Sequence, residues 1–304
     1  MKNYNFKNVI FIMEKIGIVT EEGADLPKDL IEKYQIAVAP IKMHWPEIEN
    51  LPGDNTFQKM RTATKLGIKS FGKTSQPSAK DFMDVFEKQL AHFEEVIGII
   101  LTSKLSGSFN SALQARNFLK KEDQKRVFLV DSLNVSAGES LLILRAIDKI
   151  KQGKSAEEIV KDLEKFVPLV QVIVIIEDPK WLEASGRMSP LLANWTRRAA
   201  KIGLRPLIRM KNGVLVSGGI VAGAKDIPAA LFKKFETETK KLKKEGKKIR
   251  SVITHGDDLS GAMRLKEMIE KSSENNQVAF INIIDNVLAT LTGPGSIILS
   301  WCER

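Results

Sequence analysis

Short apolar runs alternate with longer segments of helical periodicity along most of the chain. Residues 15–20 and 96–102 have the hydrophobic character of buried strands, and the second run is almost entirely apolar, as in strands covered on both faces. Between such runs, apolar residues recur at helical spacing, as Leu26, Leu30 and Tyr34 do. Repeated alternation of strand and helix predicts an α/β fold with a mostly parallel, doubly wound sheet.

The second half of the chain departs from this regularity. Residues 206–210 and 214–220 are strand candidates, and the Asn212-Gly213 dipeptide between them is a strong β-hairpin signal. Adjacent antiparallel strands do not belong in a purely doubly wound sheet. We therefore predict two domains, the number expected for a chain of 304 residues. An N-terminal α/β domain spans 14–153, and a mixed α/β C-terminal domain spans 154–304.

A capping box marks the start of one predicted helix. Ser78 and Asp81 have the required spacing, with each side chain able to reach the other residue's backbone N–H. An apolar stripe of helical spacing follows and runs from Phe82 to Phe93. We therefore predict a helix that carries the whole stripe.

The composition excludes several kinds of site. Cys302 is the only cysteine, which rules out an intrachain disulfide and any multi-cysteine metal site. The histidines, His44, His92 and His255, are too few to favour a zinc site. No apolar run approaches the ~20 residues that span a bilayer. We predict no metal, no cofactor, no stable membrane insertion and a cytoplasmic location, with Met13 as the initiator after an over-long start.

The net charge of +10 raises the question of a polyanionic partner. Much of the excess lies in residues 240–250, which end a predicted amphipathic helix and cross the turn at Gly246. Lysines suit a helix C-terminus, and a solvated face explains them. No aromatic residue is interleaved with them to stack on bases. We therefore predict no nucleic-acid binding.

Two hydroxyl-rich loops are candidates for binding an anion. Residues 73–78 and 102–108 each lead into a predicted helix, whose N-terminus presents unpaired N–H groups and the positive end of the helix dipole. At the carboxyl ends of strands in an open sheet, Thr74 and Ser106 would converge on one carboxylate or phosphate. The alternative is that these hydroxyls only cap helices, as Ser78 does.

A serine hydrolase is the competing interpretation, with Ser106 or Ser103 as the nucleophile. The chain has no G-x-S-x-G sequence, and Ser106 is flanked by Leu105 and Gly107. Only His255, directly after a predicted strand, suggests itself as a base. Phosphate-binding and dinucleotide-binding glycine motifs are also absent.

Five short motifs occur in order along the chain from Lys15 onward. They are Thr74-Ser-Gln-Pro-Ser78, Leu105-Ser-Gly-Ser-Phe109 followed by Ser111-Ala112, Asp131-Ser132, Gly186-Arg-Met-Ser189 and Thr292-Gly-Pro-Gly295. Together these motifs resemble the DegV family. The resemblance implies a two-domain α/β protein that holds one long-chain fatty acid, such as palmitate, between its domains. It also implies that the protein is the binding subunit of a bacterial fatty acid kinase. Such a subunit presents the carboxylate to a separate catalytic subunit and is not itself an enzyme.

The same resemblance implies roles for individual residues. Thr74 and Ser106 would hydrogen-bond the carboxylate, and Arg187 would be either its charge partner or a solvated turn arginine. A hydrolase acting on a lipid or acyl substrate stays open as the alternative. The chain departs from the family pattern at three places. Leu291 replaces a histidine, Glu21-Glu22 replaces Asp-Ser, and an arginine expected after the hairpin is not evident in residues 220–225. These departures suggest an altered head-group environment or an altered partner surface.

Overall fold

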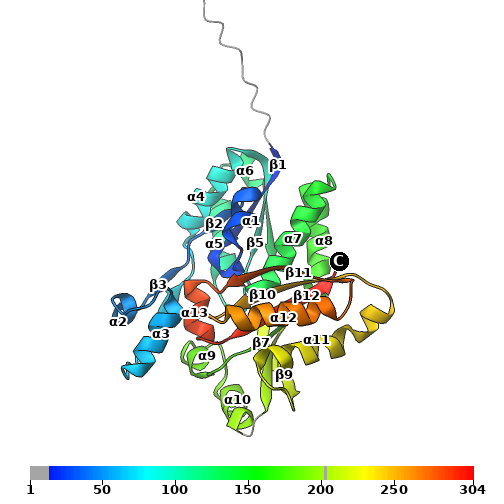
Figure 1. Ribbon diagram of the computed structural model, residues 1–304. Coiled ribbons are helices and arrows are strands. Elements are labelled where there is room, and N and C mark those ends of the chain that lie inside the picture. Colours follow the sequence, from blue (N-terminus) through cyan, green and yellow to red (C-terminus); the bar gives the residue numbers. More distant parts are fainter. Residues whose placement is uncertain (1–13, 202–203) are drawn as a thin grey trace, which may run out of the picture.

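The computed structural model describes residues 14–201 and 204–304, and the predicted initiator Met13 lies outside them (Figure 1). The N-terminal sheet has the strand order β2-β1-β5-β6, and every neighbouring pair is parallel. Its strands are β1 Glu14–Glu21, β2 Ala37–Ala39, β5 Phe93–Ile100 and β6 Val127–Asp131.

Helices cover both faces of this sheet. From β5, Val96 and Ile100 pack with α4 (Ala79–Leu90) and α5 (Ser108–Phe118) in one hydrophobic cluster. Ile97 and Ile99 belong to a second cluster on the opposite face, with α7 (Ala137–Lys151) and α8 (Ala156–Phe166). The prediction of a parallel sheet covered on both faces is confirmed. The continuous apolar run at residues 96–102 supplies side chains to both clusters.

The C-terminal sheet is mixed and has the order β11-β10-β12-β7-β8-β9. Only the β10–β11 pair is parallel within the described part of this sheet. Helices α11 (Ile227–Lys244) and α12 (Leu259–Lys271) pack on one face, and α7 lies against the other. The strands are β7 Gln171–Ile175, β8 Arg205–Lys211, β9 Val214–Val221, β10 Ile249–His255, β11 Asn276–Ile283 and β12 Ile297–Glu303.

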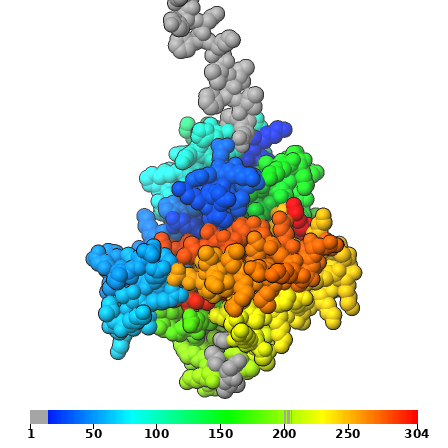
Figure 2. Space-filling model, viewed as in Figure 1, coloured from blue at the N-terminus to red at the C-terminus, as the bar shows by residue number. Residues whose placement is uncertain are grey.

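The two sheets share a hydrophobic layer. Helix α7 contacts strands of both sheets, and the largest hydrophobic cluster joins Ile99 of β5 to Val172 of β7. Helix α8, which the predicted boundary assigns to the C-terminal domain, contacts β5 and β6. The boundary between residues 153 and 154 stays a prediction. In Figure 2 the C-terminal segment containing α12 lies across the molecule between the N-terminal segment and the segment containing α11.

The predicted stripe from Phe82 to Phe93 is wrong at its end. Helix α4 ends at Leu90 and Phe93 begins β5, so that its ring packs over Gly17 of β1. A Cβ at Gly17 would lie 2.6 Å from the Phe93 ring, which explains a glycine there. The predicted capping box is confirmed, because Ser78 accepts from the Asp81 N–H and Asp81 accepts from the Ser78 N–H.

Residues 73–78 do not form the simple loop that the sequence predicted. Lys73–Ser75 is a short strand, β4, which pairs antiparallel with β3 (Lys42–His44) and aligns Thr74 with Met43. Two short helices were also not predicted, α9 (Lys180–Ala184) and α13 (Asn286–Thr292). Within residues 14–201 and 204–304, no helix combines the length and apolar character needed to cross a membrane.

Candidate functional site

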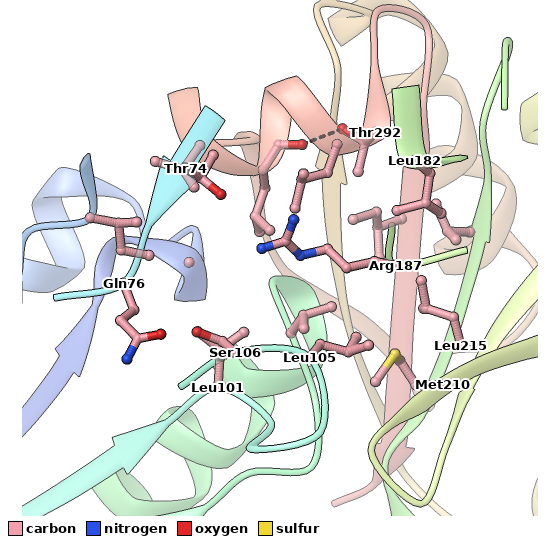
Figure 3. Close-up of a pocket in the computed structure, with 18 of the residues that line it drawn as sticks. Thr74, Gln76, Leu101, Leu105, Ser106, Leu182, Arg187, Met210, Leu215 and Thr292 are labelled. Carbon is pink, nitrogen blue, oxygen red and sulfur yellow. Dashed lines mark hydrogen bonds between the residues drawn. The ribbon is translucent and has the colours of Figure 1, made fainter. Parts of the chain in front are cut away.

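A cavity of about 430 Å³ lies between the two sheets, within the ~300–1,000 Å³ range of small-molecule sites (Figure 3). Strands, loops and helices from both halves of the chain contribute to its wall. The lining residues are Gly23, Ile41, Thr74, Ser75, Gln76, Leu101, Leu105, Ser106, Gly107, Val135, Val172, Val174, Ile176, Leu182, Arg187, Met210, Leu215, Val287, Leu288, Leu291, Thr292 and Ile298.

The three predicted ligand-binding residues line this one cavity from three different elements. Thr74 is in β4, Ser106 is in the loop between β5 and α5, and Arg187 is in the turn between α9 and α10 (Pro190–Lys201). In Figure 3 the Arg187 guanidinium extends into the space toward Thr74, Gln76 and Ser106. The structure therefore brings together residues that are far apart in the sequence.

Ser106 lies at the start of α5, where local hydrogen bonds hold its side chain. Its Oγ accepts from the Ser108 N–H at 3.2 Å and lies 2.9 Å from the Ser108 Oγ. The Ser106 backbone N–H donates to Thr102 O at 3.2 Å, which closes the turn after β5. Ser106 thus supports a helix start, and its hydroxyl also borders the cavity.

Gln76 ties the Thr74 segment to the Ser106 loop. Its Oε1 accepts from the Gly107 N–H at 3.1 Å, and its Nε2 donates to Ser111 Oγ at 3.2 Å. Across the described ranges, the Thr74 hydroxyl makes no hydrogen bond and is half-buried. Sequence reasoning did not single out Gln76, although it is part of the Thr-Ser-Gln-Pro-Ser motif.

Arg187 is the single charged side chain among the described residues that line the cavity. It is half-buried, and its Nη1 donates to Ser185 O at 3.1 Å. In the part of the chain that the structure describes, no carboxylate forms an ion pair with it. Burial lowers the pKa of Arg187 from its ordinary value, since the charged form loses solvent there. An unpaired, partly desolvated cation favours an anionic ligand.

Apolar side chains make up most of the remaining wall. Val172 and Val174 of β7, with Ile176 just beyond it, face the cavity. Ile173 and Ile175 face the opposite side and pack with α11 and α12. The period-two alternation of a strand explains this division. The sequence contained that signal, but both faces of β7 are apolar, so the pattern alone did not show which face borders a cavity.

The sequence and the fold match one protein family. The family model described as "Uncharacterised protein, DegV family" matches residues 15–304. The chain belongs to the DegV family. A DegV relative in Thermotoga maritima, named "Fatty acid-binding protein", is 29% identical over 293 residues, which cover 93% of this chain and 96% of that protein.

Solved structures of DegV family proteins have the same fold. One from Thermus thermophilus, described for its fatty acid binding, has a TM-score of 0.80 at 24% identity and covers 95% of this chain and 100% of that chain. Another, from Eubacterium eligens and loaded with heptadecanoic acid, has a TM-score of 0.76 at 20% identity and covers 95% of this chain and 99% of that chain. At these identities the likeness establishes the fold.

The structure also locates Leu291 and His255, which the sequence analysis singled out. Leu291 of α13, where the family resemblance implies a histidine, is buried and adds an apolar group to the cavity wall. His255, the base considered for a hydrolase, is not among the described residues that line the cavity. Its Nδ1 accepts from the Asp258 N–H at 3.1 Å, and burial lowers the pKa of the imidazole.

Proposed function

We propose that this DegV family protein binds one long-chain fatty acid in the cavity between its sheets. The carboxylate lies at Thr74, Ser106 and Arg187, and the acyl tail lies against the apolar wall. The observation that carries the proposal is the position of Arg187, the one cationic side chain among the described lining residues. It shares with the Thr74 and Ser106 hydroxyls a cavity that is otherwise lined mainly by apolar residues.

The energetics favour this division between head group and tail. A buried carboxylate is costly unless charged or polar donors meet it, and a guanidinium with two hydroxyls supplies such donors. Each buried methylene contributes about 0.8 kcal/mol, so about fourteen methylenes contribute roughly 11 kcal/mol before the cost of immobilising the chain. The tail then provides most of the affinity, and the polar groups orient the ligand.

Relatives support both the ligand class and a role without catalysis. The Thermotoga maritima relative is named for fatty acid binding, and the Eubacterium eligens protein was solved with heptadecanoic acid. We propose that this protein acts in the cytoplasm and presents the carboxylate to a separate fatty acid kinase subunit. Addition of ATP and such a subunit to the palmitate complex is then expected to give an acyl phosphate that hydroxylamine traps.

Native mass spectrometry of gently purified protein tests the ligand directly. We expect a co-purifying fatty acid, or a one-to-one complex after palmitate is added. Absence of both would refute the proposal. Labelling of Ser106 by a fluorophosphonate probe would instead favour the hydrolase alternative, and we expect none.

Paired variants test the head-group assignment. Thr74→Ala combined with Ser106→Ala is expected to weaken palmitate retention while circular dichroism stays unchanged. Ser103→Ala is the matched control, because Ser103 lies on the same loop as Ser106 and is not among the residues lining the cavity. Unchanged retention in the double variant would remove these two residues from the site.

A further inference from the structure

A buried carboxyl group lies behind the Ser106 hydroxyl. Ser106 Oγ is 2.9 Å from Ser108 Oγ, and the Ser108 side chain in turn lies beside the carboxyl group of Glu21 at the end of β1, where it favours the ionised form. The backbone N–H of Leu101 donates to Glu21 Oε1 at 2.8 Å. Glu21 does not line the cavity between the two sheets. Its influence on the proposed head-group site therefore passes through Ser108 and Ser106.

No cation balances Glu21 within the described structure. The ionisable groups that face it are Glu139 of α7 and Asp285 at the start of α13, and Asp25 and Asp131 face Glu139. Glu21 Oε2 is buried and makes no hydrogen bond to the described residues. Burial raises the pKa of Glu21 to about 7, although the nearby Ser108 side chain and the Leu101 N–H both act to lower it.

The protonation state of Glu21 decides which way the serine hydroxyls point. An ionised Glu21 only accepts, so the Ser108 hydroxyl donates to it and its oxygen draws the Ser106 proton away from the cavity. A protonated Glu21 donates to Ser108, Ser108 donates to Ser106, and the Ser106 proton is then free for a ligand. Protonation also removes a negative charge close to the site.

A second cavity gives the proton a route to this carboxyl group. Glu21 lines a neighbouring polar cavity of about 310 Å³, together with Glu22, Asp25, Asn55 and Asp285. Neither Ser106 nor Ser108 is among the described residues that line this second cavity. Proton exchange at Glu21 therefore does not require the ligand to leave.

We propose that Glu21 is a positioning residue for the lipid head group, and that it takes up a proton when a carboxylate anion binds at Ser106. This inference rests on the proposed function. An anion at Ser106 favours the neutral carboxyl group, so the pKa of Glu21 is higher in the complex than in the free protein. Linkage then requires the affinity for the anion to fall as the pH rises from the pKa of Glu21 in the free protein to its pKa in the complex.

The predicted pH dependence of the affinity is tested by titration with cis-parinaric acid, a fluorescent long-chain fatty acid. The titrations run between about pH 7 and pH 9, where a dispersed fatty acid is ionised. We expect the dissociation constant of the unaltered protein to rise about tenfold per pH unit over part of this range. Glu21→Gln is expected to remove that dependence. Glu22→Gln is the matched control and keeps it, because Glu22 accepts from the Ile41 N–H and is not linked to Ser108.

Calorimetry on the unaltered protein gives a second test that requires no variant. Binding heats measured in two buffers of different ionisation enthalpy are expected to show net proton uptake near pH 8. Tight binding with no proton uptake and a flat pH profile would overturn the role of Glu21 and leave the lipid site standing. Absence of binding at every pH would instead overturn the proposed function, and this inference with it.

Discussion

Arg187 determines the sign of the charge that the cavity favours. Thr74 and Ser106 can each donate to any acceptor, whether neutral or anionic. A half-buried guanidinium that has no carboxylate partner among the described residues selects an anion. The sequence predicted all three residues and left open whether Arg187 was only a turn residue. Its position in the cavity wall supports the binding role.

We expect Arg187→Gln to weaken palmitate binding about tenfold to a hundredfold, as loss of a charge-assisted hydrogen bond worth about 1.5–3 kcal/mol implies. Arg198→Gln is the control, because Arg198 is exposed on α10. Fluorescent fatty acid displacement measures both. Equal affinity of the two variants would show that the guanidinium does not meet the head group.

The β8–β9 hairpin is the element that joins the C-terminal sheet to the loop after β5. Its turn is at Asn212-Gly213, as the sequence predicted, and both residues have positive φ. The Thr102 hydroxyl donates to Gly213 O at 2.9 Å. The hairpin also supplies Met210 and Leu215 to the cavity wall, so its position shapes the site.

Gly213→Ala is expected to destabilise the protein by more than the roughly 1 kcal/mol cost of placing alanine at positive φ. An added Cβ would lie 2.6 Å from Thr102 Oγ1. Gly246→Ala is the matched control, since Gly246 also has positive φ but its Cβ would meet open space. Urea unfolding gives the free energy of unfolding of both variants. Equal losses of stability would mean that the added Cβ at position 213 does not clash with Thr102.

At the scale of the whole molecule, buried acidic residues connect the two halves. Asp25, after β1, accepts from the Asp285 N–H at 2.7 Å and from the Ser136 hydroxyl. The Asn282 side chain donates to Asp25 O at 2.9 Å. Burial raises the pKa of Asp25 and of the neighbouring Glu139 well above their ordinary values. Folding therefore favours the protonated form of both groups.

Because these pKa values are higher in the folded state, the stability that the protonated groups contribute is present at acid pH and is lost as the pH rises. We expect the free energy of unfolding to fall between about pH 5 and pH 8, by at most about 1.4 kcal/mol per pH unit for each group. Glu139→Gln should reduce this fall, whereas Glu157→Gln, at an exposed position on α8, should not. Urea titrations across this range provide the measurement, and identical slopes in both variants would contradict it.

Interactions between residues close in the sequence determined much of what could be predicted. Strand alternation, the Ser78–Asp81 capping box and the Asn212-Gly213 turn depend on neighbours along the chain, so their patterns can be read without the fold. The motifs that resemble the DegV family also pointed to Thr74, Ser106 and Arg187. The error at Phe93 has the same origin, because helical spacing continued past the residue where packing against Gly17 required a strand.

Contacts between distant segments decided the rest. The pairing of Thr74 with Met43, the face of β7 that borders the cavity and the position of Glu21 beside Ser108 all depend on which distant segments pack together. No local pattern encodes these contacts, since each partner has the same sequence neighbours whichever segment packs against it. The sequence determined which chemical groups are present, and the tertiary structure determined which of them share one cavity.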